Sequence, residues 1–212
     1  MTINLETLPE RMRSLKLTDR GIPIPWFVAY VDGLPEFRAM DPKKFTAAVK
    51  QRLCWVCGEP LGVYKVFVAG PMCGVNRTSS EPPSHQECAT WSAKNCPFLS
   101  NPRMVRREDE RMNNAQLVEN APGLALTRNP GVAMLWVTRH YEIFRSETGP
   151  LLQMGEPEFV EWYCEGREAT RSEVIASIDG GLPALEAVAR TEPGGLQALE
   201  RAMARFEKWI PL

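Results

Sequence analysis

The sequence lacks the patterns that mark membrane and secreted proteins. No run of 18 or more apolar residues occurs among its 212 residues, so we expect no membrane-spanning helix. Its first residues have neither the basic stretch nor the apolar run of a secretory signal. We therefore expect a cytoplasmic protein with no membrane partner. In that compartment, six cysteines are better explained as metal ligands and core thiols than as disulfides.

Sequence signatures of catalysis are also missing. There is no G-x-S-x-G nucleophile elbow, no G-x-x-x-x-G-K-[ST] phosphate loop and no G-x-G-x-x-G dinucleotide fingerprint. Only two histidines, His85 and His140, are available as general bases. For these reasons we predict no catalytic residue and favour a protein that is not an enzyme.

The composition is that of an ordinary globular protein, with 44% apolar and 24% charged residues and a net charge of −1. Basic residues do not gather in one long stretch, so a nucleic-acid groove is not evident. Residues 151–212 carry six Lys or Arg against eleven Asp or Glu. This acidic segment predicts a solvated helical surface, or one that faces a basic partner.

Two pairs of metal-binding residue types stand out, each with a two-residue spacer. Cys54 and Cys57 are followed directly by Gly58, which suits the positive φ of a tight turn. His85 and Cys88 repeat the spacing after 27 intervening residues and would meet on the first turn of a helix, with Ser84 as the expected N-cap. Three thiolates and one imidazole favour a tetrahedral zinc site with a structural role.

A Cys-x-x-Cys knuckle, then a strand pair, then a helix whose first turn carries two ligands resembles the treble-clef zinc finger. The resemblance covers about residues 54–95, and it implies zinc bound by Cys54, Cys57, His85 and Cys88. The loop of residues 70–83 is longer than in compact members of that group. The apolar run at residues 63–68 supplies the first strand of the expected pair.

Other residues near the two pairs leave alternatives open. Cys73 or Cys96 can replace a predicted ligand. Asn76 and Arg77 belong to a polar run suited to an anion or a nucleic-acid backbone. The H-x-E at His85 appears in zinc deaminases, but there it precedes the cysteine pair, whereas here it follows.

The remaining chain predicts an α+β fold, with a treble-clef-like zinc centre, small antiparallel β elements and a helical C-terminal tail. A hairpin is expected around Asp32-Gly33, and a helix from Asp41-Pro42. A capping box at Thr170 starts a helix that Gly180-Gly181 should end. The expected segments are an N-terminal hairpin and helix packed on the zinc module (1–53), the zinc module (54–100), a polar linker (101–122), an antiparallel β block with strands at 131–137, 141–145 and 159–164 (123–169), and C-terminal helices (170–212).

Three functions remain consistent with these patterns. The first is a non-enzymatic protein, stabilised by structural zinc, that binds a protein partner. The second is a nucleic-acid-binding zinc protein that uses Arg77 and the arginines at positions 103–111. The third is a metal-dependent hydrolase or nuclease, for which the chain offers only His140 as a second histidine.

Overall fold

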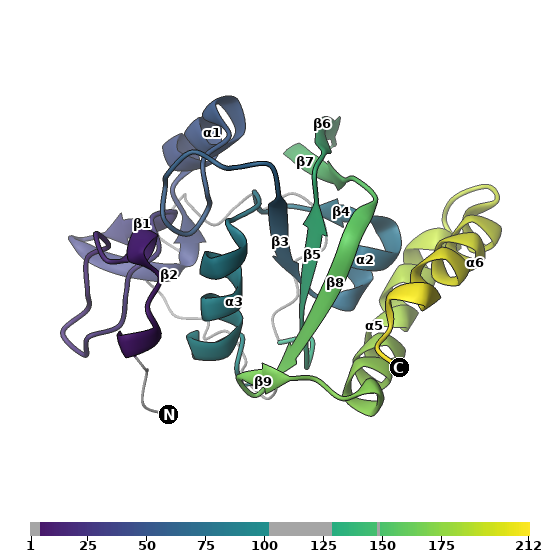
Figure 1. Cartoon of the computed structure of the whole chain (residues 1–212). Coiled ribbons are helices and arrows are strands. Elements are labelled where there is room, and N and C mark those ends of the chain that lie inside the picture. Colours follow the sequence, from purple (N-terminus) through teal and green to yellow (C-terminus); the bar gives the residue numbers. More distant parts are fainter. Residues whose placement is uncertain (1–4, 102–128, 148) are drawn as a thin grey trace.

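The computed structural model describes residues 5–101, 129–147 and 149–212, and it confirms the predicted α+β class (Figure 1). Strands of two larger sheets stand in the middle, with helices on both sides. The elements are η1 (Leu5–Thr7), η2 (Glu10–Met12), β1 (Val28–Val31), β2 (Leu34–Met40), α1 (Pro42–Gln51), β3 (Lys65–Ala69), α2 (Pro71–Asn76), β4 (Thr78–Ser79), α3 (Gln86–Asn95), β5 (Ala133–Thr138), β6 (Tyr141–Ser146), β7 (Gly149–Met154), β8 (Pro157–Cys164), β9 (Arg167–Glu168), α5 (Arg171–Ala189), α6 (Gly195–Phe206) and η3 (Glu207–Trp209).

The main sheet has the strand order β3-β5-β8-β9, and every pair in it is antiparallel. Its β5 strand is buried along its whole length, which confirms the strand predicted from the apolar run at residues 131–137. Side chains alternate across this strand. Leu135 packs with α3 on one face, and Trp136 packs with Phe206 of α6 on the other. The sheet therefore separates two apolar layers, as Figure 1 shows with α3 on one side and α2, α5 and α6 on the other.

The second sheet has the order β4-β7-β6, and it contains a strand that the sequence did not predict. Strand β7 begins at Gly149-Pro150 and continues through Leu151 and Leu152, both buried. Two adjacent apolar residues lack the alternation that marks a half-buried strand, so the pattern gave no signal. Strand β6 was predicted at residues 141–145 and is confirmed.

The N-terminal hairpin and the helix after it form as predicted. Asp32 and Gly33 both have positive φ, 52° and 80°, as a tight hairpin turn requires. Strands β1 and β2 pair antiparallel on either side of this turn. The Asp41 side chain then accepts hydrogen bonds from the backbone N–H groups of Lys43 and Lys44, which caps α1.

The predicted helix break at Gly180-Gly181 is wrong, because α5 runs unbroken from Arg171 to Ala189 with Pro183 inside it. Close packing against α2 explains why α5 has a glycine at position 181. A Cβ at this position would lie 2.7 Å from Cγ of Met72 on α2, so the absent side chain allows the two helices to approach closely. Helix packing here outweighs the roughly 1 kcal/mol propensity cost of each glycine.

The sequence also predicts a final helix with one apolar face, formed by Leu196, Leu199, Met203, Phe206 and Ile210. Most of this face of α6 packs against the core. Phe206 is buried, and Leu199 and Met203 pack against the same cluster. Leu196, the first residue predicted for that face, is exposed instead. The apolar face therefore begins one turn later than the sequence pattern indicates.

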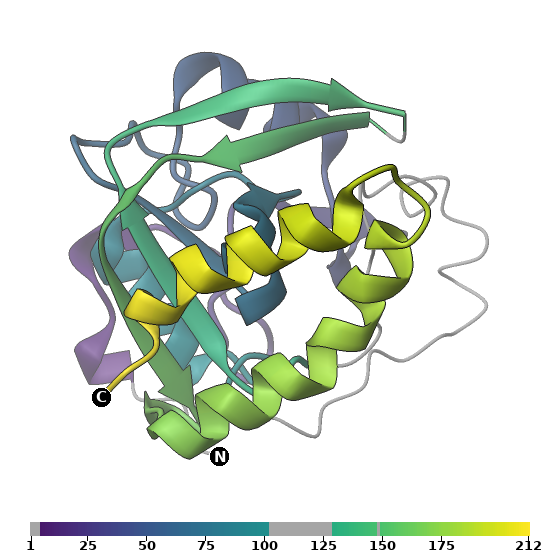
Figure 2. The ribbon, with the colours of Figure 1, turned by 90° about the vertical axis from the view of Figure 1, so that its right-hand side faces the viewer.

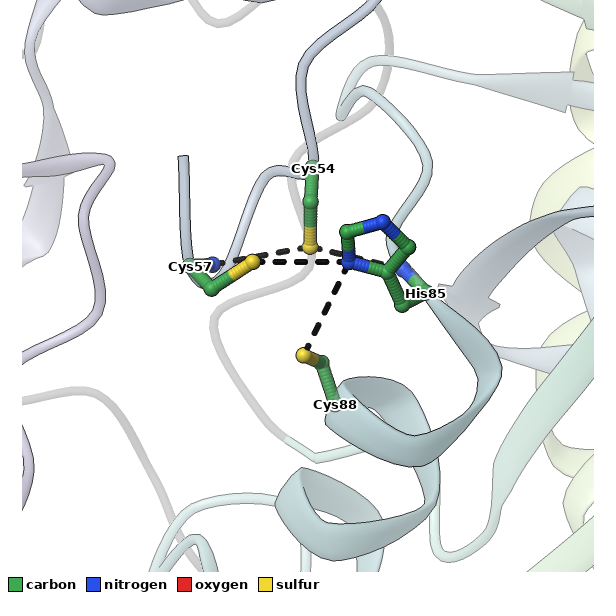
Figure 3. A group of neighbouring side chains, drawn as sticks. All are labelled: Cys54, Cys57, His85 and Cys88. Carbon is green, nitrogen blue, oxygen red and sulfur yellow. Dashed lines mark hydrogen bonds between the residues drawn. The ribbon is translucent and has the colours of Figure 1, made fainter. Parts of the chain in front are cut away.

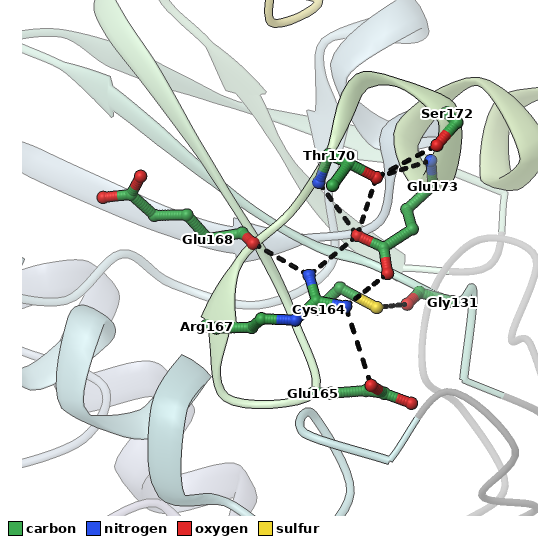
Figure 4. A network of polar contacts seen from close by, with 8 residues as sticks. All are labelled: Gly131, Cys164, Glu165, Arg167, Glu168, Thr170, Ser172 and Glu173. Atoms are coloured by element: carbon green, nitrogen blue, oxygen red, sulfur yellow. Dashed lines mark hydrogen bonds and ion pairs between the residues drawn. The ribbon is translucent and has the colours of Figure 1, made fainter.

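A polar network joins the end of the main sheet to the start of α5 (Figure 4). Thr170 and Glu173 form the predicted capping box, in which each side chain bonds the other's backbone N–H. Arg167 on β9 donates two hydrogen bonds to the Glu173 carboxylate, at 2.9 and 2.6 Å. Mainly through these bonds, Arg167 lowers the pKa of Glu173. The network fixes the direction in which the chain leaves the sheet.

Acidification is expected to remove the contribution of Glu173 to stability. A pKa that is lower in the folded state stabilises the protein above the ordinary glutamate pKa, about 4.3, and the contribution is lost as the pH falls below it. Urea unfolding at pH 7 and at pH 3 measures how much stability each protein loses on acidification. Glu173→Gln should lose about 0.5–1 kcal/mol less than wild type. Glu200→Gln, on the exposed side of α6, is the control. An equal drop in wild type and Glu173→Gln would contradict this role.

Candidate metal centre

The first pair of candidate ligands lies on a tight turn directly after α1. Arg52 is the C-cap residue of that helix and has a positive φ of 54°. The turn closes with a hydrogen bond from the backbone N–H of Gly58 to the carbonyl of Cys54, at 2.8 Å. Gly58 has φ 81°, and a Cβ there would lie 2.7 Å from the ring of Trp26. Both the backbone angle and the close ring require glycine after the second cysteine.

The second pair lies at the start of α3. His85, and not Ser84 as predicted, is the N-cap residue, and Cys88 follows in the first turn. Ser84 instead exchanges two backbone hydrogen bonds with Val66 on β3, at 2.8 and 3.0 Å. This bridge fixes the chain one residue before His85. As a result the ligand pair is held by both the sheet and the helix.

The two pairs converge on one point (Figure 3). The candidate ligand atoms of Cys54, Cys57, His85 and Cys88 all lie within 4.8 Å of one another, and all four residues are buried. A tetrahedral ion with bonds of about 2.3 Å to sulfur would place its ligand atoms roughly 3.8 Å apart. The arrangement therefore fits a metal ion held by three sulfurs and one nitrogen.

Hydrogen bonding determines which nitrogen of His85 faces the sulfurs. Nδ1 lies 3.4 Å from Sγ of Cys57 and 4.0 Å from Sγ of Cys88. Nε2 lies 3.0 Å from the carbonyl oxygen of Pro60. Because a carbonyl only accepts, Nε2 must carry the proton, and the lone pair of Nδ1 is left for a metal.

The charges of the cluster also favour a cation. A hydrogen bond from Cys57 is the main cause that lowers the pKa of Cys54, and the hydrogen bond with Cys54 is the main cause that raises the pKa of Cys88. These hydrogen bonds therefore favour the thiolate form of Cys54 and disfavour the thiolate form of Cys88. Hydrogen bonding to Cys54 raises the pKa of His85 to about 10. A dication would reverse this competition, because it stabilises all three thiolates and the neutral imidazole together.

Backbone and apolar groups complete the surroundings of the cluster. The N–H groups of Cys57 and His85 lie 3.5 and 3.3 Å from Sγ of Cys54 and donate to it. Met12 of the N-terminal segment and Trp91 of α3 are buried against the cysteines. These contacts exclude water and orient the sulfurs.

An arginine from the N-terminal segment bridges the two ligand-bearing segments. Arg11 pairs with Glu59, next to the knuckle, at 2.7 Å and with Glu87, between the second ligand pair, at 2.8 Å. All three side chains are about half exposed, so each pair contributes little to stability. The bridge also holds Glu87, the acidic residue of the H-x-E pattern, in an exposed ion pair.

The other predicted site residues do not join the cluster. Within the described residues, the metal-binding group contains neither Cys73 nor Cys96. Burial raises the pKa of both thiols, to about 11 for Cys73. Each is therefore a neutral thiol that fills space.

The predicted polar loop is largely engaged in structure. Arg77 has a positive φ of 56° at the end of α2, and its guanidinium donates two hydrogen bonds to the carbonyl of Met154 and pairs with Glu156 at 2.5 Å. The side chain of Asn76 accepts from the N–H of Thr78. Both side chains thus fix the path from α2 to β4. The arginines at positions 103–111, with all of residues 102–122 of the predicted linker, lie outside the described residues.

The treble-clef resemblance predicted a strand pair between the knuckle and α3. That prediction is wrong, because β3 pairs with a different strand. Strand β3 pairs along its whole length with β5, about 70 residues later in the chain, and meets the segment before α3 only at the Val66–Ser84 bridge. Helix α2 and the short β4 occupy the expected loop. His140, the second histidine, is exposed in the turn between β5 and β6. The knuckle and the ligand-bearing helix are present, whereas the hairpin between them is not.

The orientation of His85 makes a spectroscopic prediction. In the zinc-loaded protein, ¹⁵N-detected imidazole spectra should show a protonated Nε2 and a metal-bound Nδ1, because Nε2 donates to Pro60. Exchange of the Nε2 proton should also be slow, since this histidine is buried. The exposed His140 provides the internal control and should show no metal-dependent change. A metal-bound Nε2 would contradict this geometry.

No helix among the described residues is long and apolar enough to span a bilayer. Comparisons with protein-family models, with curated proteins and with solved structures find no match. The function must therefore be argued from the cluster itself: three buried cysteines and a buried histidine that can hold a metal ion.

Proposed function

We propose that the chain is a non-enzymatic interaction protein, stabilised by one structural zinc ion, that binds another protein. The observation that carries this proposal is the closed, buried arrangement of Cys54, Cys57, His85 and Cys88. Three thiolates and one imidazole in a tetrahedral set favour zinc over calcium or magnesium, which prefer oxygen ligands.

The closed ligand set argues against a catalytic metal. A catalytic zinc site keeps one position for water or substrate, and four protein ligands leave none. Two hollows in the described part of the chain, one lined by Trp136 and Phe206 and one by Val31 and Leu34, have volumes of about 10 and 30 Å³. Substrate pockets are usually about 300–1,000 Å³. The geometry therefore supports a metal that stabilises the fold.

A stabilising role for zinc also fits the position of the cluster. It ties the N-terminal segment around Met12 and the knuckle to α3, and neither the segment nor the knuckle contributes to the apolar layers on the main sheet. Metal binding can replace core burial in such segments. A protein surface held in shape by zinc is suited to recognition of a partner.

Nucleic-acid titrations separate this proposal from its strongest alternative. The zinc-loaded chain should show no binding to single- or double-stranded DNA or RNA that weakens steeply between about 50 and 200 mM salt. Arg77, the described residue assigned to that alternative, is engaged with Met154 and Glu156. Salt-sensitive binding that Arg77→Ala weakens would overturn the protein-partner proposal and favour a nucleic-acid-binding protein.

A further inference from the structure

Among the described residues, the second sheet ends at strand β6, which pairs with a neighbouring strand on one side. Strand β6 lies at the end of the order β4-β7-β6, and Figure 2 shows it as the outer strand of the β6–β7 hairpin along the top of the molecule. Residues 142–145 are all exposed, and Ile143 and Phe144 are 48% and 39% exposed. In an antiparallel pair, half of the backbone N–H and C=O groups of an edge strand face away from its neighbour.

This edge lacks several of the usual protections against another strand, and its charged residues are Glu142 and Arg145, one of each sign. Strand β6 contains no proline and no lysine. Its register with β7 is regular from Tyr141 to Ser146, with no bulge to twist the edge away. A regular edge with exposed Ile143 and Phe144 is suited to accept a further strand.

Symmetry limits how β6 can pair with β6 of a second copy. Directly opposite residues share one face of a sheet, so a symmetric antiparallel pair must place one residue opposite its own copy. Centring the pair on Glu142 or Arg145 would set like charges opposite each other, which is unfavourable. Among the four inner residues of β6, only Ile143 and Phe144 remain as centres.

Charge complementarity favours Ile143 as the centre. In that register Tyr141 faces Arg145 of the second copy, a cation–aromatic pair that occurs twice by symmetry. Arg139 and Glu147 flank the strand at its two ends, and in this register they lie opposite each other across the pair, again twice. Arg139 also pairs with Glu158 of its own chain at 3.1 Å, so it would bridge two carboxylates. Centring on Phe144 instead sets Arg145 opposite Ile143 and brings no opposite charges together.

We propose that β6 pairs antiparallel with β6 of a second copy, centred on Ile143, and so joins two three-stranded sheets into one of six strands. This inference deepens the proposed function, because it names a second copy of the chain as a protein partner. One strand pair buries less than the roughly 1,200–2,000 Å² of a stable interface, so the dimer should be weak and dependent on concentration.

Sedimentation equilibrium of the intact, zinc-loaded chain from about 1 μM to about 1 mM tests the proposal. Wild type should shift from monomer to dimer over this range. Ile143→Lys should raise the dissociation constant at least about tenfold, because it sets two cations opposite each other. Val188→Lys, at a position on α5 that is 49% exposed, is the matched control and should leave the constant unchanged.

A charge-swap experiment tests the register. Ile143→Lys and Ile143→Glu should each dimerise poorly alone, but an equimolar mixture should recover a heterodimer. Rescue by the corresponding Phe144 pair instead of the Ile143 pair would overturn the register. A wild-type chain that stays monomeric, or a dimer that Ile143→Lys leaves intact, would overturn the proposal. Zinc content, measured on the same samples, separates these failures from a failure of the structural-zinc proposal.

Discussion

Cys54→Ser is expected to abolish tight zinc binding and to prevent cooperative folding of the chain. Cys54 is fully buried, and its Sγ accepts hydrogen bonds from the backbone N–H groups of Cys57 and His85. Its loss removes one ligand and also the acceptor that orients two others. Structural zinc contributes about 10–16 kcal/mol in finger peptides, as much as the whole 5–15 kcal/mol stability of a typical domain.

Metal analysis by native mass spectrometry and thermal melting by circular dichroism measure this effect. Cys73→Ser is the matched control, since Cys73 lies on α2 and outside the cluster. The control should keep one zinc per chain and a cooperative transition. A Cys54→Ser protein that melts as cooperatively as the control, with zinc still bound, would refute the assignment of Cys54 as a ligand.

Trp136→Ala is expected to lower the free energy of unfolding by about 3–5 kcal/mol. Trp136 lies between the main sheet and the C-terminal helices and is only 2% exposed. Its ring stacks on Phe206 at 6.4 Å and meets Trp209 edge-on at 6.3 Å. Its Nε1 donates to the carbonyl of Gly155 at 2.8 Å. Alanine would leave a cavity among these rings and an acceptor without its donor.

Urea denaturation compares this variant with two others. Trp136→Phe keeps an aromatic ring but loses the bond to Gly155, so its effect should be intermediate. Phe159→Ala, on the neighbouring strand β8 and exposed, should cost about 1 kcal/mol or less. Similar losses for Trp136→Ala and Phe159→Ala would show that Trp136 is not central to the core.

Local signals in the sequence were sufficient for several elements. Asp32-Gly33 specified the hairpin turn, Asp41-Pro42 the start of α1, and Thr170 with Glu173 the start of α5. Each signal acts within four residues, where turn and capping chemistry dominate. The α+β class followed from these elements and is confirmed.

Features that depend on distant contacts could not be predicted in this way. The pairing of β3 with β5 joins segments about 70 residues apart, and no local pattern specifies it. Helix α5 continues through Gly181 because Met72 packs against it, a contact across more than 100 residues. In both cases tertiary packing overrides local preference.

The candidate site likewise has features that local signals predict and features that depend on distant contacts. The two-residue spacers of Cys54–Cys57 and His85–Cys88 predicted that the four residues would meet, because ligand spacing is itself a local property. The Arg11 bridge and the proton on Nε2 of His85 depend on partners from other segments. Those features emerge only from the folded chain.

Zinc content combined with thermal melting, with and without a strong chelator, tests the central claim most directly. We expect one tightly bound zinc per chain and a cooperative transition that the chelator abolishes, because the ion holds together segments that have no large core of their own. Purified protein that contains no zinc, takes up none and melts identically with and without chelator would contradict the claim.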